Sequence, residues 1–319
     1  MIDPLLEVIV QAREVQGGDV LVLELAAVDG QTLPRFAAGA HVDLHLAPGL
    51  VRQYSLCGDP AHTNVYRIGV LKDSQSRGGS VAAHEHLLPG TPMRISAPRN
   101  LFPLAGDATR SLLLGGGIGI TPMIAMAHAL HAQGQPFELH YRGSSRSRCA
   151  FVDELLAAPF AASVFTHFSD EGPEQQLDLA QVLGPATPGV HLYTCGPASF
   201  MDWVIEGARQ QGYDDAHIHH EYFQAEVDTS GGSFEVVAAR SGKTVQVQQG
   251  QTLTAALRSV GIKVEVSCEQ GVCGTCLCDV LEGQPDHRDH YLTDEEKHAN
   301  EQIVLCCSRA RGKRLVLDI

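Results

Sequence analysis

The sequence predicts a multidomain protein that joins an antiparallel β-barrel, an α/β unit with a parallel sheet, and a small mixed α/β unit at the C-terminal end. Three observations lead to this fold class. A chain of 319 residues is longer than one hydrophobic core usually serves. The spacing of the apolar residues changes along the chain, from simple alternation to runs of strand and helix. Six of the nine cysteines lie after residue 267.

Residues 1–103 consist of short segments in which apolar and polar residues alternate, with glycine and proline between them. Residues 21–25, 41–46 and 66–71 are three such segments. Regular short strands of this kind are typical of antiparallel barrels. We therefore predict a barrel domain over residues 1–103.

Residues 104–226 repeat a different pattern, in which an apolar strand is followed by a glycine turn and then by a helix. This alternation predicts a parallel sheet with helical crossovers. The hydrophilic residues 227–232 indicate a linker. Residues 233–319 then form a third domain of mixed α/β type.

Charge and composition exclude several classes of protein. The formal net charge of −14 argues against a nucleic-acid partner, because phosphates need a basic surface. No apolar run is long enough to cross a bilayer, and residues 1–30 lack the basic region and apolar core of a secretion signal. We therefore expect a cytoplasmic protein with no nucleic-acid and no membrane partner, whose cysteines act as metal or redox ligands rather than in disulfides.

Cys268, Cys273 and Cys276 follow the spacing Cys-x4-Cys-x2-Cys, and a later candidate comes at Cys306 or Cys307. This is the ligand pattern of plant-type [2Fe–2S] clusters, in which four thiolates hold two irons. A cluster of this kind moves one electron at a time, so the chain needs an electron source and an electron sink. Spacing alone leaves both later cysteines open as the fourth ligand.

The loop that carries the first three cysteines is rich in small residues. Gly271 and Gly274 tolerate positive φ, so the backbone can wrap around a compact inorganic core and point its amides at sulfur. The alternatives are a structural zinc site or unpaired core cysteines. Zinc sites favour two short knuckles, whereas here three thiols are close and one is distant, so the pattern favours an iron–sulfur cluster.

A glycine-rich turn follows the apolar strand 111–114 in the middle domain. We expect Thr121 to cap a helix whose first residue is Pro122. Glycines let a diphosphate approach the backbone, and the helix N-terminus favours its negative charge. The run does not match Gly-x-Gly-x-x-Gly, because Ile120 takes the last glycine position, so a turn that serves tight packing stays an alternative.

A second strand of the same domain ends in Cys195-Gly196-Pro197, ahead of an amphipathic helix. In an open parallel sheet, ligands bind beyond the carboxyl ends of the strands, which is where both glycine turns lie. Cys195 is then placed to touch a nicotinamide ring. The alternative is that Cys195 is a small buried core residue.

Two segments of the barrel carry groups suited to a planar phosphorylated cofactor. Residues 52–55 place an arginine and a tyrosine on one face of a strand, and a glutamine and a serine on the other. Residues 77–80 offer two glycines, a hydroxyl and a cation at a helix start, which suits a phosphate. An ordinary barrel strand and a flexible loop are the alternatives.

In their order along the chain, these segments resemble the phthalate dioxygenase reductase family, and the resemblance covers essentially the whole sequence. It implies a six-stranded antiparallel flavin-binding barrel over residues 1–103 and an NAD-binding domain over residues 104–226. It implies a plant-type ferredoxin domain of β-grasp fold over residues 233–319. The cofactors implied are FMN, NADH and a [2Fe–2S] cluster.

The resemblance also assigns site residues. FMN would contact Arg52, Gln53, Tyr54, Ser55, Gly69, Leu71, Gly78, Gly79, Ser80, Thr121 and Phe223. The pyridine nucleotide would contact Gly117, Thr121, Cys195, Gly196, Pro197 and Met201. The catalytic positions beside the reacting rings would be Ser55, Thr121 and Cys195. The family ending Cys-x-Ser-Arg-Ala matches residues 306–310 and selects Cys306, so the metal ligands would be Cys268, Cys273, Cys276 and Cys306.

The resemblance implies an NADH-dependent oxidoreductase. Electrons would pass from NADH to FMN, then to the cluster, and then to a separate Rieske-type terminal oxygenase that acts on an aromatic acid of the phthalate or vanillate kind. The chain resembles neither a Rieske pair nor a mononuclear iron site, so the substrate of the oxygenase would bind elsewhere. We expect a monomer.

Two other functions stay open at this point. One is an electron-transfer subunit of the dihydroorotate dehydrogenase type, which has a similar core and usually binds FAD, and the other is a non-enzymatic redox sensor. The choice of NADH over NADPH is also open. A basic segment after the second strand of the nucleotide domain could bind a 2′-phosphate through Arg142, Ser144, Arg146 and Arg148.

Overall fold

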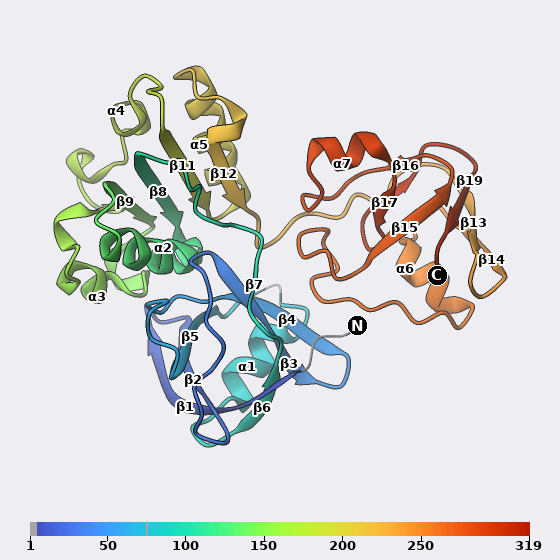
Figure 1. The fold of residues 1–319 in the computed structure, drawn as a ribbon, viewed down its shortest axis with the longest axis horizontal. Helices are drawn as coiled ribbons and strands as arrows, with labels where there is room; N and C mark the ends of the chain where they lie inside the picture. The colour runs from blue at the N-terminus through green and yellow to red at the C-terminus, as the bar shows by residue number, and fades with distance from the viewer. Residues whose placement is uncertain (1–4, 75) are drawn as a thin grey trace. The chain divides into compact units, whose positions relative to one another are not determined.

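A computed structural model describes residues 5–74 and 76–319 of the chain. The chain divides into two compact units, Met1–Phe223 and Gln224–Ile319, and each is described by itself (Figure 1). The longest helices within the described ranges have 13 residues each. None of these helices has the length and apolar character that a membrane-spanning segment needs.

The first unit begins with the predicted six-stranded antiparallel barrel. Its strands are β1 (Leu6–Gln16), β2 (Val20–Ala27), β3 (Ala40–Ala47), β4 (Leu50–Ser55), β5 (Val65–Leu71) and β6 (Pro92–Ile95). They pair in the order β4-β3-β6-β1-β2-β5, and a bridge between Leu56 and Ile68 joins the two ends of that order. The short β7 (Arg99–Asn100) pairs with β3, and α1 (Gly79–His86) follows β5.

Alternating residues fill the barrel interior. Tyr66, Ile68 and Val70 of β5 are fully buried. Leu21, Leu23 and Leu25 of β2 are fully buried as well. Side chains of a strand alternate between its two faces, so these positions share the inward face. The period-two pattern of the sequence therefore predicted both the strands and their buried side.

The second part of the first unit is a five-stranded parallel sheet in the order β10-β9-β8-β11-β12 (Figure 1). Its strands are β8 (Arg110–Gly116), β9 (Phe137–Gly143), β10 (Val164–Phe168), β11 (Val190–Cys195) and β12 (Ile218–Glu221). The α-helices between them are α2 (Ile120–Ala132), α3 (Val152–Ala157), α4 (Leu179–Leu183) and α5 (Ala198–Gln210). Short 3-10 helices are η1 (Gly117–Gly119), η2 (Arg146–Arg148), η3 (Ala161–Ser163), η4 (Pro173–Gln175) and η5 (Asp215–His217).

Apolar residues cover both faces of this sheet. Leu113 of β8 packs into the core that contains α2, whereas Leu112 and Leu114 pack into the core beneath α4 and α5. A parallel sheet covered on both faces reads as a continuous apolar run, as residues 111–114 do. The strand order reverses between β8 and β11, which places the expected ligand crevice at their carboxyl ends.

The barrel and the parallel sheet share one continuous hydrophobic core. Polar contacts add to it, since the guanidinium of Arg67 donates to Glu154 at 2.6 Å and lies 5.2 Å from the ring centroid of Phe151. The Phe151 amide donates to the Gln16 side chain at 2.8 Å. The expected boundary near residue 103 falls between β7 and β8 and stays a prediction, because the two parts pack as one compact unit.

The second unit is a mixed sheet in the order β14-β13-β19-β15-β17. Its strands are β13 (Phe234–Ala238), β14 (Lys243–Val247), β15 (Leu277–Glu282), β17 (Gln302–Val304) and β19 (Arg314–Leu317), with a separate ladder of β16 (Pro285–Asp286) and β18 (Arg309–Ala310). Its helices are α6 (Leu253–Ser259) and α7 (Asp294–Ala299). The central β13 and β19 run parallel, and α6 packs into the core against them, so the predicted β-grasp fold is confirmed.

Two pairs of histidines lie on neighbouring strands of the parallel sheet. Nδ1 of His140 lies 3.1 Å from Nε2 of His167, and Nδ1 of His191 lies 2.9 Å from Nε2 of His219. Burial, followed by the charge of the paired histidine, lowers the pKa of His167 and of His219 to about 4. The folded chain therefore holds these rings in the neutral form, in which one ring can donate and the other accept.

Acid should destabilise the folded state through these pairs. Between pH 6.5 and about 4 the unfolded chain binds protons that the folded chain does not, so the free energy of unfolding falls as pH falls. The wild-type chain should therefore lose stability faster than His219→Gln over this window in denaturant titrations. The exposed His62 supplies the control, since His62→Gln should follow the wild type. Parallel curves for all three proteins would contradict the assignment.

Candidate functional site

Three strands of the first unit bring Ser55, Cys195 and Glu221 together. Ser55 ends β4 in the barrel, and its hydroxyl donates to Oε2 of Glu221, the last residue of β12, at 3.4 Å. Cys195 ends β11 and is the register partner of Glu221. The barrel strand thus meets the carboxyl ends of the parallel strands, at the place where the sequence predicted that flavin and nicotinamide meet.

Burial controls the charges at this meeting point. It raises the pKa of Glu221 to about 8, against the opposing effect of the Ser55 hydrogen bond, so the carboxyl group carries a proton at neutral pH. Burial, and then Arg99, lowers the pKa of His41 to about 3. Although Nδ1 of His41 lies 3.9 Å from Glu221, the two groups are neutral and form no ion pair. Burial also raises the pKa of Cys195, which stays a thiol.

Glu221 and His41 are absent from the set of site residues predicted from the sequence. Both ring nitrogens of His41 are buried and have no hydrogen-bond partner within the described part of the chain. A carboxylate at the carboxyl end of a parallel strand is a signal that could have identified Glu221. His41 gave no such signal, because it occupies one of many alternating positions along a barrel strand.

Gly69 and Thr121 lie against each other where the barrel meets α2. A Cβ atom on Gly69 would come within 3.1 Å of the Thr121 methyl group and of the Phe151 ring. The Thr121 hydroxyl donates to the carbonyl of Ile118 at 2.9 Å. The expected helix cap at Thr121 is wrong: α2 begins at Ile120, so Thr121 lies inside the first turn and its side chain bonds backward rather than to a helical amide.

Arg52 lies against the start of α1, the segment that the sequence predicted to hold a phosphate. Gly78 has φ of 90° and precedes the helix, and a Cβ atom on Gly79 would lie 2.5 Å from Cγ of Arg52. The Arg52 guanidinium donates to the carbonyl of Arg77 at 3.0 Å. The Ser80 hydroxyl accepts from the Asp73 amide at 3.1 Å and keeps its own proton to donate. These groups suit a phosphate, because a guanidinium lies beside the amides at a helix start.

The other predicted flavin residues lie on β4, at the end of β5 and after β12. Nε2 of Gln53 is buried and has no hydrogen-bond partner among the described residues, so a ligand acceptor can satisfy it. Tyr54 packs against the shared core, and burial raises its pKa to about 12. Phe223 packs against the same core, and Leu71 is 40% exposed at the end of β5. The residues present therefore fit a bound flavin.

The two glycine turns interlock at the carboxyl ends of β8 and β11. A Cβ atom on Gly119 would lie 2.2 Å from the carbonyl oxygen of Cys195, and one on Gly196 would lie 3.0 Å from Cα of Gly116. Gly117 has φ of 55°, a conformation that favours glycine. The N-termini of α2 and α5 both start here, so their dipoles favour the diphosphate of a dinucleotide.

Two further predicted nucleotide residues lie at the start of α5. Pro197 directly precedes α5 and closes the second glycine turn. Met201 is fully buried in the apolar core beneath α5, a position that also suits a purely packing role. The glycines and Cys195 thus lie close together, whereas Met201 lies in the core beneath α5.

The basic segment after β9 already has partners for its charges. Arg146 donates to Asp153 at 2.7 Å, and Arg148 lies 3.9 Å from Asp19. The Arg142 guanidinium lies 6.0 Å from the ring centroid of Phe200 and 5.9 Å from that of Trp203. A 2′-phosphate would have to compete with these contacts.

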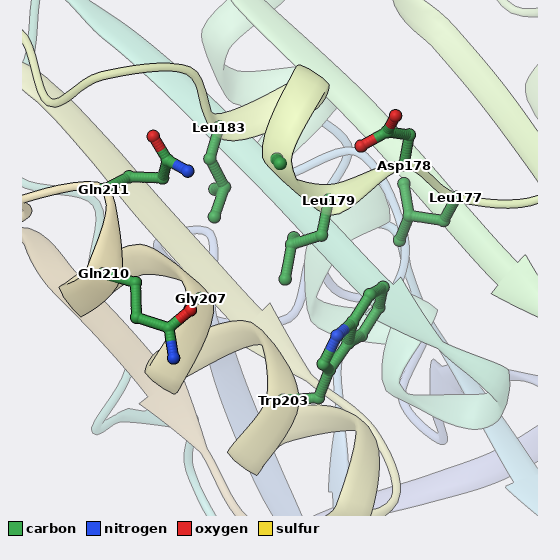
Figure 2. A pocket seen from close by; sticks show the side chains of 9 residues that line it. Leu177, Asp178, Leu179, Leu183, Trp203, Gly207, Gln210 and Gln211 are labelled. Atoms are coloured by element: carbon green, nitrogen blue, oxygen red, sulfur yellow. The ribbon is translucent and has the colours of Figure 1, made fainter.

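A cavity of about 300 Å³ lies between α4 and α5, with Trp203 on one side (Figure 2). None of the predicted flavin or nicotinamide residues lines it. Its lining residues are Leu177, Asp178, Leu179, Ala180, Leu183, Trp203, Gly207, Gln210 and Gln211. The single charged group, Asp178, accepts from the Gln181 amide at the start of α4, so it acts as a helix cap.

In the second unit, the four predicted ligand cysteines are all buried, with exposed fractions of 8% or less. The Gly271 amide donates to the sulfur of Cys306 at 3.2 Å, and the Cys306 amide donates to the sulfur of Cys276 at 3.3 Å. The Gln270 amide donates to the sulfur of Cys268 at 3.3 Å. Backbone amides thus point at the thiols, as stabilisation of thiolate charge requires.

These thiols share protons with one another. Hydrogen bonds from Cys273 and then Cys306 lower the pKa of Cys268 to about 2. Hydrogen bonds to Cys268 raise the pKa of Cys273 and of Cys306, and Cys306 is raised further by Cys276. Crowded thiols of this kind release their protons when metal cations bind to the sulfurs.

The described ranges contain no group of three or more histidine, cysteine or acidic side chains arranged around a single metal ion. The spacing of the four cysteines is that of a [2Fe–2S] site rather than that of the two short knuckles of a zinc site. The loop geometry agrees with this reading: Gly271 and Gly274 have φ of 76° and 69°. A Cβ atom on Gly274 would lie 2.2 Å from the ring of Tyr291.

Comparisons with known proteins agree with this geometry. Residues 236–311 match the family described as a 2Fe-2S iron-sulfur cluster binding domain. The chain is 50% identical over 318 residues to the vanillate O-demethylase oxidoreductase of Pseudomonas sp. (strain HR199 / DSM 7063), covering 99% of this chain and 100% of that protein. It is 40% identical over 291 residues to the carnitine monooxygenase reductase subunit of Acinetobacter pittii (strain PHEA-2), covering 91% and 95%.

A solved structure matches at full length. The crystal structure of phthalate dioxygenase reductase, described as modular for electron transfer from pyridine nucleotides to [2Fe–2S], is 35% identical and superposes with a TM-score of 0.76. The match covers 99% of this chain and 98% of that one. A flavin and pyridine-nucleotide unit joined in one chain to a [2Fe–2S] unit defines an iron–sulfur flavoprotein reductase.

The chain belongs to the phthalate dioxygenase reductase family, as its motifs predicted. Flavin, NAD(H) and a [2Fe–2S] cluster are the cofactors of this family, and its members are oxidoreductases. The predicted enzyme class is therefore confirmed.

Proposed function

We propose that this chain takes electrons from NADH, passes them through FMN to its [2Fe–2S] cluster, and delivers them to a Rieske-type terminal oxygenase. The observation that carries this proposal is the pairing of two sites in one chain. One is the meeting point of Ser55, Cys195 and Glu221, and the other is the four-thiol site in the second unit. A hydride donor and a one-electron acceptor need a flavin between them, because a flavin supplies both kinds of chemistry.

The side chains of the first unit position and shield the reaction. Ser55 is 5% exposed and Cys195 is fully buried, so both side chains are covered by protein atoms. Glu221 holds a proton at neutral pH and is hydrogen-bonded to Ser55. The pair can therefore keep a proton at the hydroxyl beside the flavin.

We propose FMN as the flavin. The support is the cradle of Arg52, Gly78, Gly79 and Ser80, in which a guanidinium lies beside a helix start. We propose NADH as the donor, because the cations after β9 are held by carboxylates and aromatic rings. Both are further supported by the family resemblance.

The proposed substrate of the partner oxygenase is an aromatic acid of the vanillate kind. The support is the identity of 50% to a vanillate O-demethylase oxidoreductase, against 40% to the carnitine monooxygenase reductase subunit. Co-expression with each type of oxygenase tests this choice. Turnover of carnitine, with no demethylation of vanillate, would contradict it.

Replacing Arg52 by alanine should weaken flavin retention while the cluster absorbance stays. A hydrogen bond to a charged group contributes about 1.5 to 3 kcal/mol, so the affinity should fall roughly tenfold to a hundredfold. The measurement is the flavin content of the purified chain and its recovery on titration with FMN. Arg94→Ala, on the exposed side of β6, serves as the control and should keep its flavin. Equal flavin content in both variants would contradict the phosphate cradle.

A further inference from the structure

Arg288 holds the backbone of residues 228–230 against the second unit. Its Nη1 donates to the carbonyl of Asp228 at 2.7 Å and to that of Ser230 at 2.9 Å. Its Nε and Nη2 donate to Asp286 at 2.9 and 2.6 Å, which fixes the direction of the guanidinium. The arginine therefore ties this segment to the ladder of β16 and β18.

Arg309 holds the next part of the same segment. It is 2% exposed, which is rare for an arginine, and Nη2 donates to the carbonyl of Gly232 at 3.0 Å. Nη1 donates to the carbonyl of Gln251 at 2.7 Å, and the guanidinium lies 5.2 Å from the ring centroid of Phe234. The guanidinium of Arg309 thus donates to backbone carbonyls.

Gly231 lies between the two guanidinium groups. A Cβ atom on it would come within 3.6 Å of Nη2 of Arg288 and of Nε of Arg309. Its φ of 113° also favours glycine. Residues 228–232, which the sequence indicated as a linker, are therefore enclosed by an arginine clamp, by which we mean Arg288 and Arg309.

The clamp shortens the tether between the two compact units. Phe223 packs into the core of the first unit, and Val227 packs into the core of the second. Only residues 224–226 separate them, so four peptide steps join the two cores. If the clamp opened and Val227 left the second core with it, so that Phe234 became the first anchored residue, the tether would have eleven steps. At about 3.5 Å a step, its maximal reach would grow from roughly 14 Å to roughly 39 Å.

We propose that the arginine clamp sets the rate at which electrons pass from the flavin unit to the cluster unit, by keeping their tether short. The inference rests on the proposed electron path and names two positioning residues that touch neither cofactor. The effective concentration of tethered groups falls with about the three-halves power of tether length. Opening the clamp should therefore slow transfer between the units about fourfold to fivefold.

Residues 306–309 link the clamp to the cluster site. Ser308 precedes Arg309, and its hydroxyl accepts from the Arg288 amide at 3.2 Å and donates to Asp289 at 3.3 Å. Cys306 lies three positions before Arg309. Because Arg309→Gln could disturb the cluster directly, the more exposed Arg288 supplies the second variant.

The test uses the holoenzyme with Arg288→Gln, Arg309→Gln and the control Arg240→Gln. Arg240 lies on the same unit and pairs with Asp318, away from the tether. Cleavage by a glutamate-specific protease after Glu226 reports the tether directly and needs no activity. Stopped-flow absorbance then separates flavin reduction by NADH from the later reduction of the cluster. A fourth protein carries four Gly and Ser residues inserted after Glu226, which lengthens the tether with the clamp intact.

The clamp variants should be cleaved faster, reduce flavin at the wild-type rate and reduce the cluster about fourfold to fivefold more slowly. The insertion should slow cluster reduction about threefold. Unchanged cleavage in Arg288→Gln would overturn the clamp, and faster cleavage with an unchanged second phase would overturn its role in transfer. If the wild-type cluster is not reduced by NADH at all, the proposed function fails instead, and the cleavage result still decides the clamp.

Discussion

Replacing Cys306 by alanine is expected to remove the [2Fe–2S] cluster, whereas the same replacement at Cys307 is expected to keep it. The sulfur of Cys306 accepts from the Gly271 amide at 3.2 Å and is hydrogen-bonded to Cys268 and Cys276. The sulfur of Cys307 instead lies 3.8 Å from the carbonyl of Val304 and 3.8 Å from the Ser308 hydroxyl. Cys306 therefore contacts two of the other predicted ligands, whereas the contacts of Cys307 are with Val304, Ser308 and Cys306 itself.

The loss should appear only in one-electron chemistry. Changing an outer contact of a metal site costs about tenfold to a hundredfold in affinity or activity, so losing a ligand should lower cytochrome c reduction by on the order of a hundredfold or more. Reduction of ferricyanide by NADH should persist, because it needs only the first unit. Cluster absorbance and iron content of the purified variants measure the loss of the cluster itself. A bleached Cys307→Ala protein beside a coloured Cys306→Ala protein would reverse the assignment.

Glu221→Gln is expected to change how stability depends on pH. Because burial raises the pKa of Glu221 from 4.5 to about 8, the folded chain keeps a proton that the unfolded chain releases above pH 4.5. The contribution of Glu221 to stability is complete below pH 4.5 and is lost as pH rises to 8. Glutamine is neutral at every pH, so its contribution to the free energy of unfolding does not change. The stability of the variant should therefore rise relative to that of the wild type as pH rises.

The relative gain should be on the order of 4 kcal/mol across this window, since one pKa unit corresponds to about 1.4 kcal/mol. Denaturant titrations of the flavin-free chain from pH 5 to pH 9 measure it. Glu85→Gln is the matched control, because Glu85 is an exposed carboxylate on α1. A constant difference between Glu221→Gln and the wild type across the range would show that Glu221 ionises normally.

Much of the fold followed from local patterns. Alternation predicted the barrel strands, and the buried series of Tyr66, Ile68 and Val70 shows why it worked: each of these inward positions is apolar. The run 111–114 predicted a strand covered on both faces. The cysteine spacing predicted a loop whose glycines have positive φ, and Gly271 and Gly274 do.

The failures came from contacts between distant parts of the chain. Glu221 meets Ser55 across 166 positions, and no local pattern records that contact. Thr121 has the residue type of a helix cap, but the helix starts at Ile120, two residues before the expected Pro122, and Gly119 packs against the Cys195 carbonyl. The sequence indicated a linker at 227–232 from its polarity, and the two arginines that enclose it lie more than 55 residues further on.

The most direct test of the electron path is an anaerobic titration of the purified chain with NADH, followed by electron paramagnetic resonance at low temperature. The path from pyridine nucleotide through flavin to the four-cysteine site predicts a rhombic signal of a reduced [2Fe–2S] cluster that grows with added NADH. A chain that shows this signal with dithionite but not with NADH would contradict the path. A chain that shows no signal with either reductant would contradict the cluster itself.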